Sequence, residues 1–257
     1  MGCIQDNVLI PCQTQTTRRI ETGLSAYEPI IVRKDPLNPN IDLKNKLAVL
    51  FDFDGVLMQS IEDHHRSWNE VFRSYNTEIG WEEFSVLEGQ SLYAIARQLC
   101  QRHGIDESES EKIGRTKNEI YLRTARLKLY DGVYPLLDVV KEKKMKLALV
   151  TGAHRDRFER SVNEAFLSYF EAVVTADDVM HTKPDPEPFI KAASKLGVEN
   201  SKCIVVENAP LGIESAKKAG MFCIALTTTL TESFLKGGDL IVNNLKDLKN
   251  IFKDIPC

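Results

Sequence analysis

The sequence predicts a doubly wound α/β fold, in which a parallel, Rossmann-like sheet carries an inserted all-helical cap. Five short runs are apolar on both faces, apart from a leading lysine in two of them, as buried parallel strands are, and segments with helical periodicity separate several of them. A long segment after the first run has no strand-like pattern and is amphipathic at helical spacing. Strands that alternate with helices are typical of a sheet covered by helices on both faces.

Each predicted strand stops at polar residues. The five runs cover residues 46–51, 146–150, 172–174, 203–206 and 222–226. The clearest helical periodicity between them covers residues 187–196 and 213–219. Because parallel strands in such folds bind ligands at their carboxyl ends, we expect the polar residues that follow the strands to converge on one edge of the sheet.

We divide the chain into an N-terminal arm or linker (1–46), a core (47–58 and 127–257) and a helical cap (59–126). The arm is polar and rich in prolines near its end, with at most a short strand at 30–32. Within the cap, the amphipathic stretches cover residues 67–72, 92–100 and 112–127. A helical segment inserted after the first strand would lie above the strand ends and can cover the site as a lid.

Composition excludes several classes of protein. The net charge of −4 argues against a nucleic-acid-binding surface. The six cysteines have no metal-ligand spacing, and we interpret them as reduced thiols of a cytoplasmic protein. The sequence has no apolar run of the ~20 residues that a bilayer requires. Gly2 and Cys3 resemble an acylated start, but Asp6 stands where myristoylation needs Ser or Thr, so lipidation is the less favoured interpretation.

Two aspartates, Asp52 and Asp54, directly follow the first predicted strand. Paired carboxylates at the rim of an apolar core are unfavourable without a partner, and Mg²⁺, which prefers oxygen ligands and accompanies phosphate, would be one. Asp52 could then attack phosphorus and form an aspartyl-phosphate, while Asp54 donates a proton to the leaving oxygen and later takes one from water. Gly55 would allow the sharp turn that directs both acids into one cavity. The alternative is a helix N-cap in which the aspartates only accept amide hydrogen bonds.

Polar residues elsewhere along the chain would complete a phosphate site. Thr151 and Gly152 offer a hydroxyl and amides to phosphate oxygens at a strand-to-helix turn. Lys183, which we place at a third strand end, opens a segment stiffened by prolines. A lysine there would neutralise the charges of phosphate and nucleophile together. The alternative is a solvated surface lysine. Glu207 and Asn208 close the fourth strand with a second oxygen cluster for a metal.

The order of these motifs resembles the four motifs of the haloacid-dehalogenase-like (HAD) superfamily, from about residue 47 to the C-terminus. The helical insertion stands in the place of that superfamily's small helical cap. The resemblance implies a HAD-type core with Asp52 as nucleophile, Asp54 as general acid/base and Thr151 and Lys183 as phosphate binders. It also implies a Mg²⁺ ion held by Asp52, Asp54, Glu207 and Asn208.

The last motif departs from the family pattern. Relatives of this type usually have Glu-Asp, where this sequence has Glu207-Asn208. Asparagine still offers a carbonyl oxygen but no negative charge, so we expect weaker Mg²⁺ binding or a greater reliance on Glu207.

The cap is similar to that of the β-phosphoglucomutase-like group. His64 matches that group's cap histidine, Gly89-Gln90-Ser91 matches its small-residue specificity loop, and Lys117-Asn118 matches its cap pair that faces phosphate. The alternatives are an exposed helix histidine at position 64 and a solvated lysine at position 117.

The motifs favour phosphoryl transfer, because a second aspartate two residues after the nucleophile marks the phosphate-handling branch of the superfamily. The mutases have an arginine just after the loop serine, and this sequence has Leu92, so a bidentate clamp for a bisphosphate is missing there. We therefore expect a Mg²⁺-dependent phosphatase that hydrolyses a small phosphomonoester, such as a sugar phosphate or a phosphoglycolate-like compound. The alternatives are a β-phosphoglucomutase-like mutase and, supported only by Asn208 and the N-terminal arm, a catalytically silent binding protein.

Overall fold

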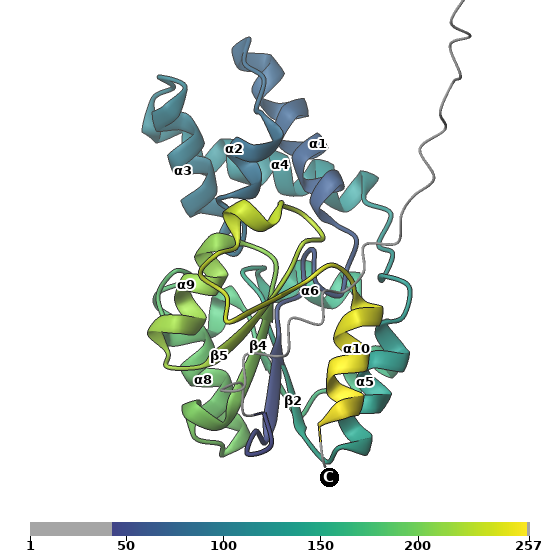
Figure 1. The fold of residues 1–257 in the computed structure, drawn as a ribbon. Helices are drawn as coiled ribbons and strands as arrows, with labels where there is room; N and C mark the ends of the chain where they lie inside the picture. Colours follow the sequence, from purple (N-terminus) through teal and green to yellow (C-terminus); the bar gives the residue numbers. More distant parts are fainter. Residues whose placement is uncertain (1–42, 256–257) are drawn as a thin grey trace, which may run out of the picture. The chain divides into compact units, whose positions relative to one another are not determined.

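The computed structural model describes residues 43–255, which form a six-stranded parallel sheet with helices on both faces (Figure 1). The strand order is β3-β2-β1-β4-β5-β6. The strands are β1 (Ala48–Phe51), β2 (Lys146–Val150), β3 (Ala172–Val174), β4 (Cys203–Glu207), β5 (Phe222–Leu226) and β6 (Leu240–Val242). The predicted fold class and all five predicted strands are confirmed, and β6 is an additional strand. The motif at Gly2 and Cys3 and the short strand expected at 30–32 lie outside the described residues.

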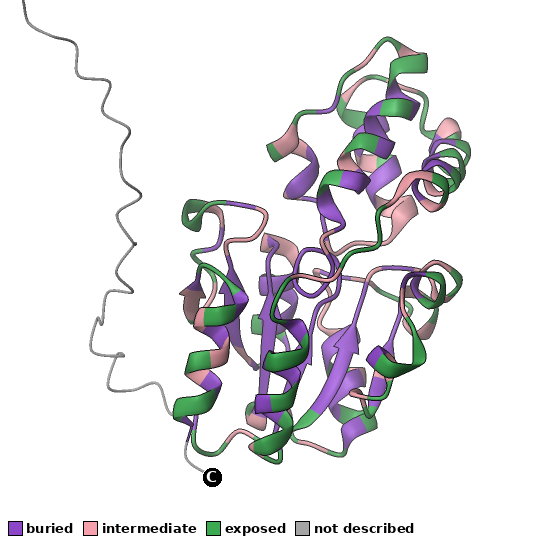
Figure 2. Cartoon of the chain, turned by 90° about the vertical axis from the view of Figure 1, so that its right-hand side faces the viewer, coloured by how far each residue is buried: buried purple, intermediate pink, exposed green. Residues whose placement is uncertain are grey.

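The sheet is buried between two layers of helices. On one face, α8 (Glu187–Leu196) and α9 (Pro210–Lys218) pack on the sheet and share its apolar core. On the other face, α5 (Val133–Glu142) and α10 (Leu245–Asp254) pack against each other (Figure 1). All four residues of β1 are buried, and the strands form the purple centre of the core in Figure 2. This explains why the strands are apolar on both faces.

The boundaries of α8 follow from its sequence. Pro188 lies in its first turn, where a missing backbone N–H leaves no hydrogen bond unmade, and Gly197 adopts a left-handed conformation just after its end. The predicted helix at 187–196 is therefore confirmed. The one expected at 213–219 begins earlier, because Pro210 starts α9. Two shorter helices, α6 (Arg155–Ser161) and α7 (Glu164–Leu167), follow β2.

The segment between β1 and β2 contains four helices before α5. These are α1 (Ile61–Phe72), α2 (Trp81–Ser85), α3 (Leu92–Arg102) and α4 (Ser110–Thr124). They enclose an apolar core of their own, which includes Trp68, Phe72 and Phe84. The three predicted helical stretches are found in α1, α3 and α4, and we refer to the segment that carries these four helices as the cap.

Three strands bring the candidate site together. Phe51 of β1 pairs with Leu149 of β2 on one side and Val206 of β4 on the other. Asp52, Thr151 and Glu207 therefore lie at neighbouring strand ends. Lys183 differs from its predicted position, because it lies in the connection between β3 and α8 and not at a strand end.

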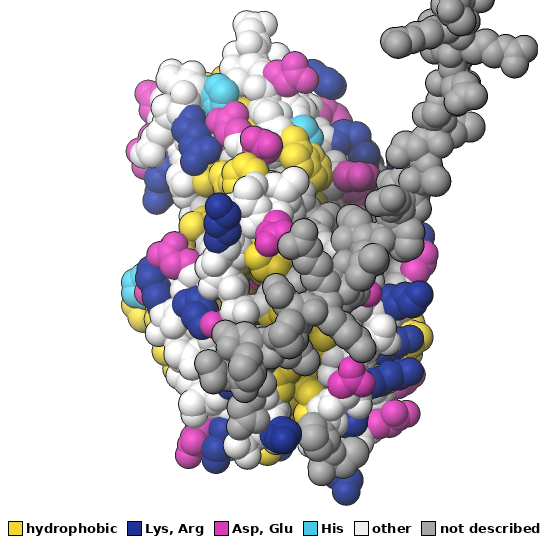
Figure 3. All heavy atoms as spheres, in the orientation of Figure 1, with side chains coloured by type: hydrophobic (Ala, Val, Ile, Leu, Met, Phe, Trp, Pro, Cys, Tyr) yellow, Lys and Arg dark blue, Asp and Glu magenta, His cyan; other side chains and the backbone are white. Residues whose placement is uncertain are grey.

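Acidic and basic side chains are interspersed over the face of the molecule shown in Figure 3. Within residues 43–255, no helix is both long enough and apolar enough for a membrane crossing.

Candidate active site

Two buried carboxylates at the ends of β1 and β4 share one ammonium group. Lys183 Nζ lies 2.5 Å from Asp52 Oδ1 and 2.6 Å from Glu207 Oε1. Although burial lowers the pKa of Lys183, the two carboxylates outweigh it and raise this pKa, so the lysine stays protonated. Burial raises the pKa of Asp52 well above its ordinary value, with Lys183 opposing and Glu207 reinforcing the shift. Lys183 is buried, so the alternative of a solvated surface lysine is wrong.

Glu207 is held in one position by its surroundings. Its Oε2 atom accepts hydrogen bonds from the backbone amides of Asn208 and Ala209, at 2.8 and 3.1 Å, just before α9 begins. A Cβ atom on Gly212 would come within 1.8 Å of Glu207 Oε1. The carboxylate therefore occupies space that only a glycine at position 212 leaves open.

Asp54 is surrounded by three polar side chains, Ser60, His64 and Arg157, from the start of α1 and from α6. Its Oδ1 atom accepts a hydrogen bond from Ser60 Oγ at 2.6 Å and lies 3.3 Å from His64 Nε2. Arg157, in α6, donates to Oδ2 at 2.7 Å and to Oδ1 at 3.3 Å. Burial would raise the pKa of Asp54, but Arg157 and His64 together hold it well below its ordinary range.

The helix N-cap alternative for the two aspartates is not found. Within the described residues, the first helix after β1 is α1, which begins at Ile61, and its capping residue is Ser60. The hydrogen bonds of Asp52 and Asp54 come from side chains. Gly55 has φ +81°, and a Cβ atom there would meet Asn208 Nδ2 at 2.2 Å, so the turn after Asp54 requires glycine.

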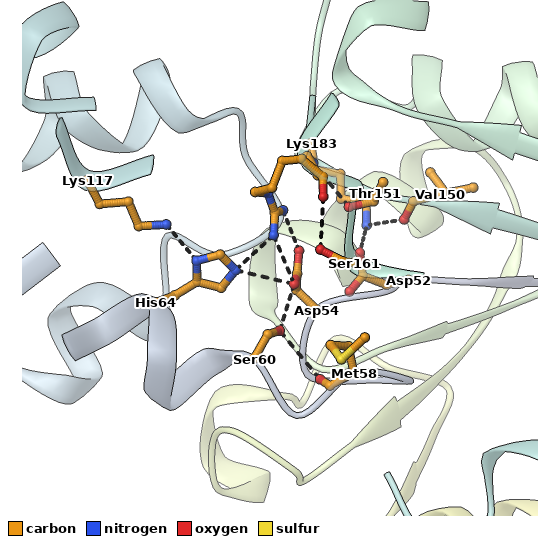
Figure 4. A network of polar contacts seen from close by, with 12 residues as sticks. Asp52, Asp54, Met58, Ser60, His64, Lys117, Val150, Thr151, Ser161 and Lys183 are labelled. Atoms are coloured by element: carbon orange, nitrogen blue, oxygen red, sulfur yellow. Dashed lines mark hydrogen bonds and ion pairs between the residues drawn. The ribbon is translucent and has the colours of Figure 1, made fainter. Parts of the chain in front are cut away.

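A chain of polar contacts connects the cap with Asp54. Figure 4 shows Lys117 pointing to His64, and His64 pointing to Asp54. Lys117 Nζ lies 2.6 Å from His64 Nδ1, and the imidazole stacks on Tyr121 with ring centroids 4.0 Å apart. Burial and then Lys117 lower the pKa of His64 to about 3, so the imidazole is neutral at physiological pH. Both His64 and Lys117 are buried, so the exposed alternatives for them are wrong.

One cavity lies between the cap and the core. Its lining includes Asp52, Asp54, Glu88, Lys117 and Arg157. Glu88 is buried, and burial followed by repulsion from Asp54 raises its pKa to about 7. Burial and then Arg157 lower the pKa of Lys117 to about 7. The cavity therefore presents titratable groups of both signs to whatever enters it.

The predicted specificity loop closes this cavity from the cap side. Gly89 has φ +91°, and a Cβ atom there would lie 3.1 Å from Lys183 Cδ. A Cβ atom on Gly152 would meet the Gln90 carbonyl oxygen at 2.6 Å. Ser91 caps α3, because its hydroxyl accepts a hydrogen bond from the Ala94 amide, and the Thr151 hydroxyl accepts one from the Ala153 amide at 3.1 Å.

The oxygen donors at the strand ends fit a hard divalent cation such as Mg²⁺. Asp52 and Glu207 contribute buried carboxylates that lie close enough together to share the Lys183 ammonium group. The Asn208 amide nitrogen donates a hydrogen bond to Thr229 Oγ1 at 2.7 Å. The side-chain oxygen of Asn208 is the atom of this amide that can serve as a ligand to a cation.

Sequence reasoning missed two largely buried charged residues of this cavity, Arg157 and Glu88. One signal could have found Arg157. It lies in the first turn of α6, where the helix dipole disfavours a positive charge unless an anion is near. Glu88 gives a weaker signal, as a lone acidic residue between Leu87 and the loop glycine.

A family model described as haloacid dehalogenase-like hydrolase matches residues 49–226, which contain the first five strands, apart from Ala48 of β1, and the whole cap. The chain belongs to this family. The expected HAD-type enzyme is therefore confirmed, and so is its likeness to the β-phosphoglucomutase-like group.

Two relatives of this HAD-like enzyme are phosphatases by name. This chain is 31% identical over 206 residues to validoxylamine A 7'-phosphate phosphatase of Streptomyces hygroscopicus subsp. limoneus. The match covers 79% of this chain and 95% of the relative. It is 33% identical over 184 residues to a fructose-1-phosphate phosphatase of Escherichia coli (strain K12), covering 68% and 93%. A candidate β-phosphoglucomutase from Bacteroides vulgatus has a similar solved structure, with a TM-score of 0.72 at 30% identity, covering 82% and 88%.

Proposed function

We propose that this HAD-like enzyme is a Mg²⁺-dependent phosphatase that hydrolyses a small phosphomonoester, a sugar phosphate or a phosphoglycolate-like compound, in the cytoplasm. The observation that carries the proposal is that Lys183 bridges Asp52 and Glu207 at the edge of the sheet. Asp52 and Asp54 both line the cavity between the cap and the core. The names of the two phosphatase relatives support the same reaction class.

In the first step, a carboxylate oxygen of Asp52 attacks phosphorus and the bond to the ester oxygen breaks, which leaves an aspartyl-phosphate. Asp54 is deprotonated while Arg157 holds its pKa low, so it serves as the proton donor only after the substrate has displaced Arg157 from the carboxylate. It then donates a proton to the departing oxygen, and the product leaves as a neutral alcohol. Lys183 lies next to the nucleophile and, with its pKa raised by the carboxylates, stays charged to balance the phosphoryl group.

In the second step, a water molecule attacks the phosphorus of the aspartyl-phosphate, and the bond to Asp52 breaks. Asp54, which gave up its proton in the first step, takes one from the attacking water. Phosphate then leaves, and both aspartates return to their initial states. Asp52, the Asp54 backbone carbonyl, Glu207 and Asn208 would hold the Mg²⁺ ion, which when bound balances the negative charge of the phosphoryl group.

The test is phosphate release from a panel of phosphorylated metabolites, with Mg²⁺ and with a chelator, for the wild type and for Asp52→Asn. We expect chelation to abolish release, and Asp52→Asn to lower kcat by at least about 10³-fold. If the wild type and Asp52→Asn behave alike, the enzyme proposal fails and the silent binding protein replaces it.

A separate assay distinguishes hydrolysis from the mutase reaction. The enzyme is incubated with β-glucose 1-phosphate and a trace of β-glucose 1,6-bisphosphate, and both free phosphate and glucose 6-phosphate are measured. The proposal predicts that free phosphate accumulates. Formation of glucose 6-phosphate in its place would establish the mutase.

A further inference from the structure

Arg157 brings a guanidinium group into the cavity from the core side. Its side chain is only 11% exposed, and it is bidentate on Asp54. Its guanidinium carbon lies 5.4 Å from the centroid of the Tyr121 ring, which belongs to the cap. The Ser161 hydroxyl donates to the Arg157 carbonyl oxygen at 2.9 Å, one turn further along α6.

The position of Arg157 conflicts with the work of Asp54. Both carboxylate oxygens of Asp54 accept hydrogen bonds from Arg157, and Oδ1 also accepts one from Ser60. An ester oxygen that receives a proton from Asp54 has to approach one of these two atoms within hydrogen-bond distance. Arg157 must therefore give up at least one of its contacts when a substrate is bound.

A guanidinium that leaves Asp54 in this cavity needs another anion. A buried charge that loses its partner is strongly unfavourable, and Arg157 has little solvent to turn to. Glu88 is the carboxylate of the cap side of the cavity, and Lys117 lies on the same side. Asp156 also lines the cavity, but it is paired with Arg160 at 3.0 Å. Glu88 therefore has to serve both Arg157 and Lys117, and positive charge remains for an anionic group of the substrate.

We propose that Arg157 determines specificity at the leaving-group end of the site. On binding, it exchanges Asp54 for a second negatively charged group, a carboxylate or a phosphate, on the alcohol part of the substrate. This inference rests on the proposed phosphatase function. In the sequence, Leu92 indicates the loss of an arginine clamp from the cap loop. Leu92 lines the same cavity as Arg157, so α6 supplies the guanidinium group that the cap loop lacks.

The experiment compares esters that differ only in the second charge. One pair is 2-phosphoglycolate and 2-hydroxyethyl phosphate, which tests a carboxylate; the other is fructose 1,6-bisphosphate and fructose 1-phosphate, which tests a phosphate. The wild type should prefer the doubly anionic member of at least one pair. Arg157→Gln should lower the ratio of kcat/KM for the doubly anionic member to kcat/KM for the singly anionic member by about 10- to 100-fold, with the loss for the doubly anionic member mainly in KM. Arg157→Lys should lose less than Arg157→Gln.

The matched control is Arg160→Gln, which removes an exposed arginine from the same helix and should leave both pairs unchanged. If Arg157→Gln lowers kcat/KM equally for both members of a pair, Arg157 only positions Asp54 and the inference is wrong. Equal use of both members of each pair by the wild type also overturns it.

A binding measurement keeps the inference testable without turnover. Thermal shifts are recorded in Mg²⁺ with either phosphonoacetate or 2-hydroxyethylphosphonate. Neither phosphonate can be hydrolysed. A larger shift with phosphonoacetate in the wild type, lost in Arg157→Gln, supports the inference. Equal shifts in the wild type, together with equal use of fructose 1,6-bisphosphate and fructose 1-phosphate, contradict it. Failure of the phosphatase proposal would look different, as an absence of phosphate release from every ester by the wild type.

Discussion

Gly152 and Gln90 meet where the cap loop closes on the core. A Cβ atom on Gly152 would lie 2.6 Å from the Gln90 carbonyl oxygen and 2.7 Å from that of Gly89. Both obstacles are backbone atoms, which cannot rotate away as a flexible side chain can. The loop therefore reaches this position only because residue 152 has no side chain.

Gly152→Ala should hinder closure of the cap without unfolding the protein. We expect kcat/KM to fall by about 10- to 100-fold, because a displaced loop no longer encloses the substrate. The change is measured by steady-state kinetics, with thermal unfolding to compare the folded states. Gly80→Ala is the control, because a Cβ atom there would have its nearest contact at 3.8 Å. Unaltered kinetics in Gly152→Ala would show that the loop is not held this closely during turnover.

Glu88→Gln should change how stability depends on pH. The pKa of Glu88 is raised to about 7 in the fold from 4.5, so the fold holds its proton more tightly than the unfolded chain does. The resulting stability is fully present below pH 4.5 and is lost as pH rises through 7. The variant lacks this loss. Its free energy of unfolding should therefore rise relative to that of the wild type by about 1–3 kcal/mol as the pH increases from 4.5 to 7.

The gain in Glu88→Gln is measured by urea unfolding of both proteins at several pH values. Lys117, whose pKa is lowered to about 7 from 10.5, affects stability above pH 7 and in the opposite direction. His64, whose pKa is lowered to about 3 from 6.5, also affects stability below pH 6.5, but both proteins contain it, so the difference between them reports on Glu88. A difference between the two proteins that stays constant across this window would contradict the prediction.

Asn208→Asp should strengthen Mg²⁺ binding, because it adds a negative charge beside Glu207. We expect the Mg²⁺ concentration for half-maximal activity to fall by about 3- to 10-fold. Asn208 donates to Thr229 Oγ1, so Thr229→Val is the control for the loss of that contact alone. If Asn208→Asp leaves the Mg²⁺ dependence as it was, residue 208 does not contribute to a metal site.

Gly212→Ala should displace the Glu207 carboxylate, because the new Cβ atom would lie 1.8 Å from its Oε1 atom. We expect kcat to fall by at least about 100-fold, since a small misplacement of a catalytic group has effects of that size. Circular dichroism checks that the fold is kept. Gly237→Ala is the control, as its nearest contact would be the Ile213 side chain at 3.2 Å. A nearly normal rate would mean that the exact position of Glu207 matters little.

The strands were predictable because their apolar runs are uninterrupted and end at polar residues. The runs at 146–150 and 222–226 coincide with β2 and β5. β6 was not predictable in this way, since it is only the three residues Leu240–Val242, and two of them are half-buried. An edge strand of that length gives no periodicity to detect.

The candidate site was predictable where its residues stand at fixed places in motifs, as Asp52, Asp54 and Glu207 do. For Arg157 the sequence offers only its place in the first turn of α6, which is a weak signal because a charged residue in a charged helix is usually exposed to solvent. Its burial depends on a contact with Asp54, which is distant in sequence and becomes a neighbour only in the folded chain. The roles of all these residues stay predictions until the variants are measured.

The strand order also determines when a nascent chain can complete its sheet. β1 lies between β2 and β4, and its first residue, Ala48, pairs with Lys146 and Cys203. Synthesis therefore releases β1 from the ribosome long before both of its neighbours exist. The helices from Ile61 to Thr124, in contrast, emerge as one continuous segment with an apolar interior of their own. A ribosome stalled before residue 203 would carry the four cap helices beside a β1 with one edge unpaired.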